Sequence, residues 1–340
     1  MAEKLLKEAL FAHAMPEQQL RCDLCAQHCL LEPGETGVCG ERINHQGVLY
    51  TSNYGRLIAA HVDPIEKKPL YHFLPGSRSF SIAAPGCNFR CEWCQNWDIS
   101  QASAQNDPKR LAYVPPQAAV SQALNAGCSS ISYTYTEPTV FFEYALDAAR
   151  LAKEAGLRNV FVTNGYMTRT ALEAITPFLD AANVDIKAFS DEVYRNHIGA
   201  RLKPVLESCE RMKAAGIWLE VTTLLIPGLN DDGEQLQALA QYIATRLGVD
   251  TPWHISRYFP QYQFQSVPPT PLESIALACR LGAEAGLKFV YGGNVSAWGE
   301  THCPNCGALL LSRQALSLAF NHLKDGCCPI CGTRIAGVWA

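Results

Sequence analysis

The sequence predicts an α/β protein in which repeated strand and helix units form a partial barrel between two cysteine-rich flanks. Short β-branched runs alternate with longer helical patterns from about residue 79 to residue 291. Twelve of the fifteen cysteines fall in three clusters, and two of these clusters lie outside the alternating region. We therefore expect an N-terminal cysteine-rich extension over residues 1–74, a partial barrel over 75–295 and a C-terminal module over 296–340.

The composition is that of a globular protein with a large core. Hydrophobic residues make up 48% of the 340 residues and charged residues 18%. The net charge of −4 argues against a general nucleic-acid binder, which would carry a basic surface. The N-terminal segment lacks the pattern of a signal peptide, and no run approaches the ~20 apolar residues that cross a bilayer. We expect a cytoplasmic protein without a membrane partner.

Seven short apolar runs are predicted as strands, and the segments between them as helices, several of which end at glycine. Repeated units of this kind form a parallel sheet with right-handed crossovers. They are numerous enough for a partial (β/α)6 barrel of the TIM type, in which chemistry occurs at the carboxyl ends of the strands. The predicted strands are residues 80–84, 129–135, 158–163, 183–187, 217–226, 253–258 and 288–292.

A loop with three cysteines follows the first predicted strand. The stretch PGCNFRCEWCQNWD places Cys87, Cys91 and Cys94 in the spacing C-x3-C-x2-C. Three thiolates leave one position of a four-ligand site open. From the spacing alone, a distant Cys or His could complete a zinc site, or an external ligand could complete an iron-sulfur cluster.

With Trp93 before the last cysteine, this loop resembles the hallmark C-x3-C-x-(aromatic)-C of the radical S-adenosylmethionine (SAM) enzymes. The resemblance implies that Cys87, Cys91 and Cys94 hold three irons of a [4Fe-4S] cluster and that SAM chelates the fourth. It implies reductive cleavage of SAM, with Trp93 near the cofactor. It also implies an electron donor such as flavodoxin or ferredoxin.

The segment after the second strand resembles the Gly-Gly-Glu-Pro segment of pyruvate formate-lyase activating enzymes, which binds the ammonium group of SAM. Thr136, Glu137 and Pro138 are therefore expected to contact the cofactor. Tyr135 and Thr136 stand where the family has glycines, which allow close approach of the backbone. The alternative for Glu137 is an acidic residue at the start of a helix.

The later strand ends also carry polar residues. Asn164, Asp185 and Lys187 resemble residues that line the SAM site in activating enzymes. Asp185 and Lys187 share one face of their strand, so the alternative is a mutual salt bridge. His254, on the sixth strand, is a further candidate at the mouth, although a lone histidine is more often structural. We expect Asp185, Lys187 and His254 to be catalytic as well as cofactor-binding.

The N-terminal cluster has the spacing C-x2-C-x3-C-x9-C. Four thiolates in one segment suit either a closed zinc site or a second iron-sulfur cluster, and the neighbouring His28 could replace one of them. A flank of this size cannot fold by hydrophobic burial alone, so metal binding would stabilise it. The expected ligands are Cys22, Cys25, Cys29 and Cys39.

The C-terminal cluster contains two C-P-x-C-G turns, the pattern of a zinc ribbon. Cys327 adjoins the second turn and is either a spare thiol or an alternative ligand. Cys128, Cys209 and Cys279 are isolated and are expected to be small hydrophobic residues. The expected zinc ligands are Cys303, Cys306, Cys328 and Cys331.

Taken together, these motifs resemble the AmmeMemoRadiSam group of radical SAM enzymes, relatives of the activating enzymes. One departure is Ala336, where the group has proline. The resemblance implies association with AMMECR-type and Memo-type proteins, and a small-molecule or protein substrate. An activating enzyme would install a glycyl radical on a partner protein. The alternative from a different class is a zinc-stabilised binding scaffold without catalysis.

Overall fold

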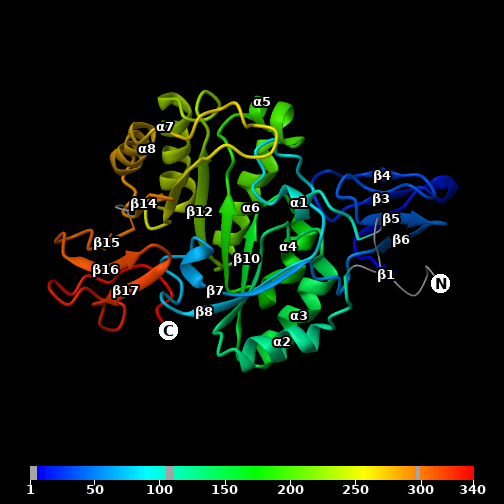
Figure 1. The fold of residues 1–340 in the computed structure, drawn as a ribbon, viewed down its shortest axis with the longest axis horizontal. Coiled ribbons are helices and arrows are strands. Elements are labelled where there is room, and N and C mark those ends of the chain that lie inside the picture. Colours follow the sequence, from blue (N-terminus) through cyan, green and yellow to red (C-terminus); the bar gives the residue numbers. More distant parts are fainter. Residues whose placement is uncertain (1–5, 105–110, 296–298) are drawn as a thin grey trace.

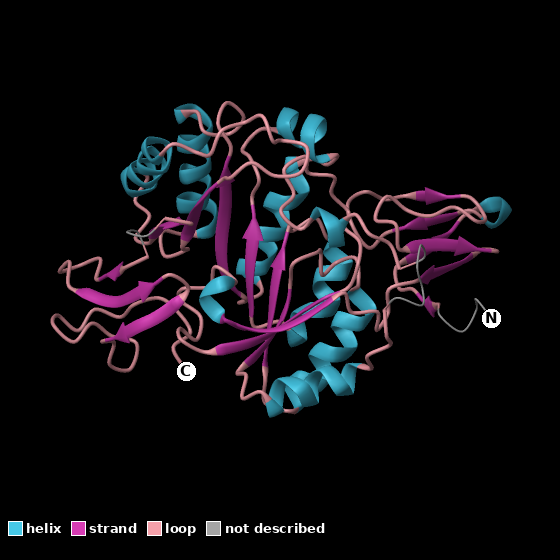
Figure 2. Cartoon of the chain, in the orientation of Figure 1, coloured by secondary structure: helices cyan, strands magenta, loops and turns pink. Residues whose placement is uncertain are grey.

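The computed structural model describes residues 6–104, 111–295 and 299–340. An eight-stranded sheet with its helices forms the centre, and three small sheets lie beside it (Figure 1). The N-terminal strands and the C-terminal strands lie at opposite ends of the molecule (Figure 2). The predicted start of the C-terminal module, residue 296, lies outside the described residues.

Seven strands of the central sheet are parallel and adjacent in chain order, which confirms the predicted α/β arrangement. An eighth strand, β7 (Ala59–Pro64), pairs antiparallel with the first of them and was not predicted. In the described ranges β7 and β14 each have a single neighbour, so the sheet is open. The parallel strands are β8 (Arg78–Ala83), β9 (Ser130–Tyr133), β10 (Arg158–Thr163), β11 (Ala181–Asp185), β12 (Trp218–Leu225), β13 (Trp253–Arg257) and β14 (Val290–Gly293).

Helices follow the parallel strands and cover one face of the sheet. Phe161 and Leu219 belong to the large core on this face, together with the alanine-rich side of α3. The helices are α1 (Trp97–Ser100), α2 (Pro116–Asn125), α3 (Phe142–Glu154), α4 (Arg169–Ile175), α5 (Asp191–Val193), α6 (Leu202–Ala214), α7 (Gly233–Tyr242) and α8 (Leu272–Glu284). Single turns of 3-10 or π-helix occupy η2 (Pro16–Gln18), η3 (Ile65–Lys67), η4 (Thr176–Phe178), η5 (Tyr194–Ile198) and η6 (Ile243–Leu247).

The other face of the sheet is covered by a segment from before the first parallel strand. Because strand side chains alternate between faces, Val160 points away from the helices, and it packs against Ile65, Leu70 and Phe73. These contacts lie toward the amino ends of the strands. The carboxyl ends on the same face are left for the cavity described below.

The flanking sheets are small and antiparallel. The N-terminal sheets contain β1 (Lys7–Glu8), β5 (Arg42–His45) and β6 (Val48–Thr51), and β2 (Ala12–Ala14), β3 (Leu20–Cys22) and β4 (Leu30–Leu31). The C-terminal sheet contains β15 (Thr301–His302), β16 (Leu309–Gln314) and β17 (Ser317–Asn321). Its core residues Leu310, Leu311 and Ile335 pack with Tyr71 and Tyr291, so this module adheres to the β14 edge of the central sheet. Across the ranges described, the helices are all too short or too polar to span a membrane.

Candidate active site

A cavity of about 810 Å³ lies at the carboxyl ends of the parallel strands. It gathers the predicted residues from the cysteine loop and from the ends of four later strands, although these are up to 167 residues apart in sequence. Pro138 is the one predicted residue of this set that does not line the cavity. The lining includes Cys87, Cys91, Trp93, Cys94, Thr136, Glu137, Asn164, Asp185, Lys187 and His254.

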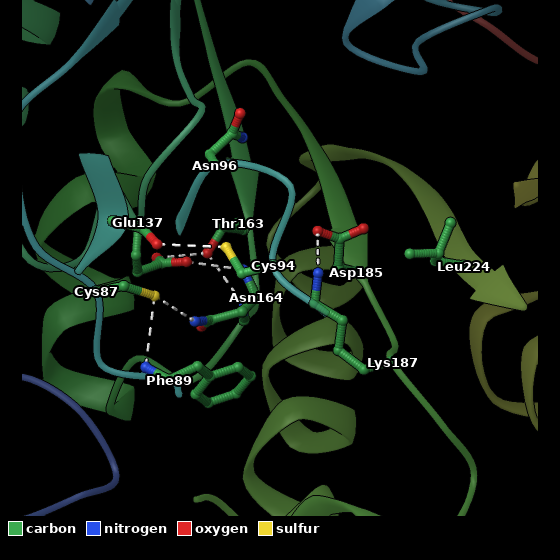
Figure 3. Close-up of polar contacts among 12 residues, drawn as sticks. Cys87, Phe89, Cys94, Asn96, Glu137, Thr163, Asn164, Asp185, Lys187 and Leu224 are labelled. Atoms are coloured by element: carbon green, nitrogen blue, oxygen red, sulfur yellow. Dashed lines mark hydrogen bonds and ion pairs between the residues drawn. The ribbon is translucent and has the colours of Figure 1, made fainter. Parts of the chain in front are cut away.

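Hydrogen bonds to sulfur hold the cysteine loop in place (Figure 3). The amide of Phe89 donates to Cys87 Sγ at 3.4 Å, and Asn164 Nδ2 lies 3.9 Å from the same sulfur. Cys94 Sγ lies 3.3 Å from the hydroxyl of Ser100. The three cysteines are free thiols. Trp93 is buried and packs edge-on against a phenylalanine, Phe264, which fixes the turn between the second and third cysteines.

The surroundings of the cysteine loop disfavour the thiolate form unless a cation is bound. Burial raises the pKa of Cys87 well above its usual value, and the charge of Glu137 raises it further. Burial likewise raises the pKa of Cys91 to about 12, although Lys187 opposes this shift. Thiolates form at neutral pH in such a site only when a metal supplies compensating positive charge. Two such thiols, with Cys94 on the same loop beside an open cavity, therefore fit a metal cofactor.

Glu137 is almost completely buried, and both of its oxygens are already occupied. Oε1 accepts hydrogen bonds from the amide and hydroxyl of Thr139 and from the hydroxyl of Thr163 at 2.7 Å. Oε2 accepts from the amide of Asn164 at 2.8 Å. In this structure the carboxylate therefore orders the end of β10. Its expected contact with the SAM ammonium stays a prediction.

Asp185 and Lys187 form a mutual ion pair, which the sequence analysis gave as the alternative to cofactor binding. Their side chains are 2.8 Å apart and partly exposed to the cavity (Figure 3). Burial opposes the charge on Lys187, but Asp185 and then Cys91 outweigh it and raise the pKa of the lysine. The pair is therefore charged and lies beside the cysteine loop, and cofactor contact is compatible with its position.

His254 lies in the depth of the cavity and is held by Glu220, a residue that the sequence analysis missed. His254 Nε2 is 2.6 Å from Glu220 Oε2, and both residues are almost fully buried. Glu220 also accepts from the amides of Tyr71 and His72 and from the indole of Trp218. Burial alone would raise the pKa of Glu220, but its hydrogen bond to His254 helps to lower it. The histidine therefore has a fixed orientation with a charged partner behind it.

The two residues that replace the family glycines adopt different conformations. Tyr135 has a φ of 65°, in the left-handed region where glycine is favoured. Its backbone oxygen accepts from Asn96 Nδ2 at 2.8 Å, and its hydroxyl donates to Asp63. The Thr136 hydroxyl donates to the Ala84 oxygen at 2.7 Å. Side-chain contacts therefore hold a backbone shape that glycine would adopt freely.

The end of the cavity away from the cysteine loop is polar and was also missed. Glu66, Thr222 and Arg313 line it, and each has a buried polar atom without a hydrogen-bond partner. Arg313 comes from the C-terminal module and stacks over the Tyr71 ring at 4.1 Å. Lys68 is 1% exposed and pairs with Asp63 at 2.7 Å. The run DPIEKKP, with four charges beside apolar residues, was the one available sequence signal.

The four N-terminal cysteines surround a second, small cavity. Cys22, Cys25, Cys29 and Cys39 all line it. His28 does not, and its ring pairs with Asp23 at 2.7 Å.

The four C-terminal cysteines of the two C-P-x-C-G turns converge. Their sulfurs all lie within 4.8 Å of one another, with the closest pairs, Cys303 with Cys331 and Cys306 with Cys328, at 3.6 and 3.7 Å. Tetrahedral zinc with Zn–S bonds of about 2.3 Å requires sulfurs about 3.8 Å apart. The set can hold one metal ion. Cys327 lies outside it and is near the Asp325 oxygen.

Comparison with known proteins adds a family match and two kinds of relative. The model of the "Radical SAM superfamily" matches residues 81–242, which span the cysteine loop and β9 to β12. The uncharacterized protein MJ0808 of Methanocaldococcus jannaschii is 44% identical over 334 residues, which cover 97% of this chain and 99% of the relative.

More distant relatives include proteins that are named for an activity. The pyruvate formate-lyase 1-activating enzyme of Escherichia coli is 22% identical over 170 residues, which cover 49% of this chain and 69% of that enzyme. Among solved structures, a radical SAM methyltransferase from Sphaerobacter thermophilus superposes with a TM-score of 0.51. It is 17% identical and the match covers 70% of this chain and 71% of the other, so the likeness is one of fold.

Proposed function

We propose a function from one premise: the chain belongs to the radical SAM superfamily. Members of this superfamily are enzymes, and membership implies a [4Fe-4S] cluster and SAM. The proposed function is reductive cleavage of SAM followed by radical chemistry on a small molecule. The observation that carries it is the single cavity shared by the three free cysteines and the polar strand ends. In this reading the open sheet is the partial barrel expected from the sequence.

Cys87, Cys91 and Cys94 would hold the cluster, each through one thiolate. When bound, the cluster supplies the electron that breaks a carbon-sulfur bond of SAM. The chain's own groups tune that site. The amide of Phe89 and the side chain of Asn164 donate toward Cys87 Sγ, and such hydrogen bonds to sulfur set a cluster's potential.

Asp185 and Lys187 would bind the zwitterionic end of SAM. They present one negative and one positive group 2.8 Å apart beside the cysteines, which matches an ammonium and a carboxylate on one carbon. Thr136 and Asn164 line the same part of the cavity. Glu137 contributes by holding the backbone of Asn164.

His254 would act on the substrate. It lies near the polar end of the cavity, and its hydrogen bond to Glu220 fixes the orientation of its ring. An imidazole in this position can exchange a proton with a substrate or product.

Other parts of the proposal concern cofactors and partners. The C-terminal cysteines would hold zinc, and the N-terminal cysteines zinc or a second iron-sulfur cluster. The electron donor would be a flavodoxin or ferredoxin. AMMECR-type and Memo-type proteins remain proposed partners, and the cytoplasm the proposed compartment.

A second candidate is an activating enzyme that installs a glycyl radical on a partner protein. Its support is the similarity to the Escherichia coli activating enzyme. The small molecule is preferred because the cavity is walled on the substrate side by Lys68 and by Arg313 and Leu316 of the C-terminal module. A partner's glycine loop would have to displace this wall.

The test uses protein reconstituted with iron and sulfide without oxygen. The wild type is expected to show a [4Fe-4S] spectrum and dithionite-dependent cleavage of SAM, and Cys91→Ala to lose both. Cys279→Ala on α8 is the control and should retain both. Retention of both by Cys91→Ala would refute the proposal, and a protein with zinc but no iron would be the binding scaffold. Mass spectrometry of the product distinguishes 5′-deoxyadenosine from methylthioadenosine and so identifies the broken bond.

A further inference from the structure

The small cavity among the N-terminal cysteines is a second candidate cofactor site. We call Cys22, Cys25, Cys29 and Cys39, with the cavity that they line, the N-terminal cage. We infer that the N-terminal cage holds a [4Fe-4S] cluster and not zinc. The inference concerns a site separate from SAM cleavage, so it does not depend on the proposed function.

The spacing of the sulfurs separates the two metals. A zinc ion draws four sulfurs to about 3.8 Å from one another, since each Zn–S bond is about 2.3 Å. The C-terminal cysteines have this spacing, with all four sulfurs within 4.8 Å. In the described ranges no three sulfurs of the cage satisfy the same limit, and neither do Cys87, Cys91 and Cys94. Wider spacing around a cavity is what a cluster requires, because each thiolate binds a different iron.

The cage also contains buried hydrogen-bond donors that no nitrogen or oxygen of the described residues satisfies. Arg42 and Asn88 both line it and are each 1% exposed. Arg42 Nε has no partner, and the Asn88 side chain reaches only the sulfur of Cys25. A buried donor without a partner is costly, and the sulfides of a cluster accept hydrogen bonds from such groups. A four-thiolate zinc site has no sulfide to offer them.

The charges around the cage suit thiolate ligands. The guanidinium of Arg42 lines the cage together with the four cysteines. Arg42 is itself held by Glu143 at 2.5 Å, so the guanidinium cannot turn away from the sulfurs. The thiols thus have a fixed cation beside them and need a metal to complete the charge balance.

The cage is in direct contact with the active-site loop. A Cβ on Gly86 would lie 2.9 Å from the backbone oxygen of Cys39, so only glycine fits between the two. Gln27 Nε2 donates to the Asn88 oxygen at 2.9 Å. Asn88 lines the cage and directly follows Cys87 in the chain. Its Oδ1 accepts a hydrogen bond from Asn164 Nδ2 at 2.7 Å. One residue therefore separates the two cysteine sets.

The decisive experiment removes the active-site ligands and counts what remains. The variant Cys87→Ala, Cys91→Ala, Cys94→Ala is reconstituted without oxygen as the full chain. It is expected to retain about four irons and four sulfides, with a [4Fe-4S] electron paramagnetic resonance signal that SAM does not alter. Adding Cys22→Ser and Cys39→Ser should abolish that signal, whereas adding Cys128→Ala and Cys209→Ala should not.

Three results would overturn the inference. The triple variant could contain no iron and about two zinc ions per chain, the second in the cage. It could contain iron that survives Cys22→Ser and Cys39→Ser. If the triple variant does not fold, the wild type decides: Mössbauer quantification of about eight irons, with only one of two signals shifted by SAM, supports the second cluster, and about four irons refutes it. Failure of SAM cleavage with eight irons bound would instead count against the proposed function alone.

Discussion

At the scale of single residues, Gly86 is a position with little conformational freedom. It precedes Cys87, has a φ of 100°, and meets both the Cys39 oxygen and the side chain of Glu41. A methyl group here would lie 2.7 Å from Glu41 Cγ. The residue thus meets two separate demands, a left-handed backbone and a close contact.

Gly86→Ala is expected to destabilise the protein by about 1–3 kcal/mol more than Gly127→Ala. Gly127 is the matched control, since its φ is 64° but a Cβ there would meet nothing within 4 Å. Both variants therefore place an alanine at a positive φ, which strains the backbone. Only Gly86→Ala also creates a steric clash. Chemical denaturation measures the difference, and iron content shows whether the loop has moved. Equal losses in the two variants would mean that the contact with Cys39 is unimportant.

The residues with an unusual sequence pattern were predictable, and their supporting partners were not. Cys87, Asp185 and Lys187 were found because thiols at short spacing and charges at a strand end have few structural uses. Glu220 and Arg313 were missed, since each is a single charged residue in its strand and its partner lies far away in sequence. Asn88 was missed because an asparagine in a loop usually signals only a turn.

At the scale of elements, the parallel strands were predictable and the antiparallel ones were not. Strands buried on both faces appear as apolar β-branched runs, and each of the seven predicted runs overlaps a strand. β7 was missed because its residues are largely exposed and it ends in proline. The strands of the N-terminal extension have two to four residues, too few to show a period. The two domain boundaries stay predictions.

The segment before β8 is tied to the C-terminus through a neutral histidine. His72 Nδ1 is 2.7 Å from the Ala336 oxygen, and Nε2 is 2.6 Å from the Tyr291 hydroxyl. Nδ1 donates to the Ala336 carbonyl, so in the neutral ring Nε2 accepts from the Tyr291 hydroxyl. The pKa of His72 is lowered to about 4, mainly by burial, with Arg313 and His254 acting in the same direction and Glu220 opposing the shift.

Stability is therefore expected to fall as the pH drops from about 6.5 to 4. In that range the unfolded chain binds a proton at this residue and the folded chain does not, which removes up to about 3 kcal/mol. His72→Gln should lack this part of the acid sensitivity, whereas His45→Gln, at an exposed site, should keep it. Urea unfolding at pH 7 and pH 5 measures how the free energy of unfolding of each variant changes with pH. A wild-type slope in His72→Gln would contradict the assignment.

At the scale of the whole molecule, the C-terminal module is a wall of the active-site cavity. Arg313 reaches the cavity from β16 and donates to the Tyr71 oxygen at 2.7 Å. Because the module has a small core, we expect its fold to depend on the metal that the four cysteines would hold. Loss of that metal should therefore open the cavity at its polar end.

The variant Cys328→Ser, Cys331→Ser is expected to lose about one zinc ion per chain while its iron content is unchanged. Trypsin should then cleave at Arg313, which is buried in the folded sheet. Cys327→Ser is the control and should keep both the zinc and the resistance, because Cys327 lies outside the metal set. Unchanged proteolysis in the double variant would show that the module folds without metal.

The contacts of the N-terminal cage have a consequence for synthesis of the chain. Cys25 pairs with Met167, and Gln27 donates to the Gly199 oxygen at 2.8 Å, so the surfaces that close the cage are made more than a hundred residues later. On the ribosome the four thiols therefore emerge early and stay uncovered until most of the central sheet exists. During that interval we expect the nascent chain to be at its most sensitive to oxidation, and the closed site for the inferred cluster to exist only once the sheet has folded.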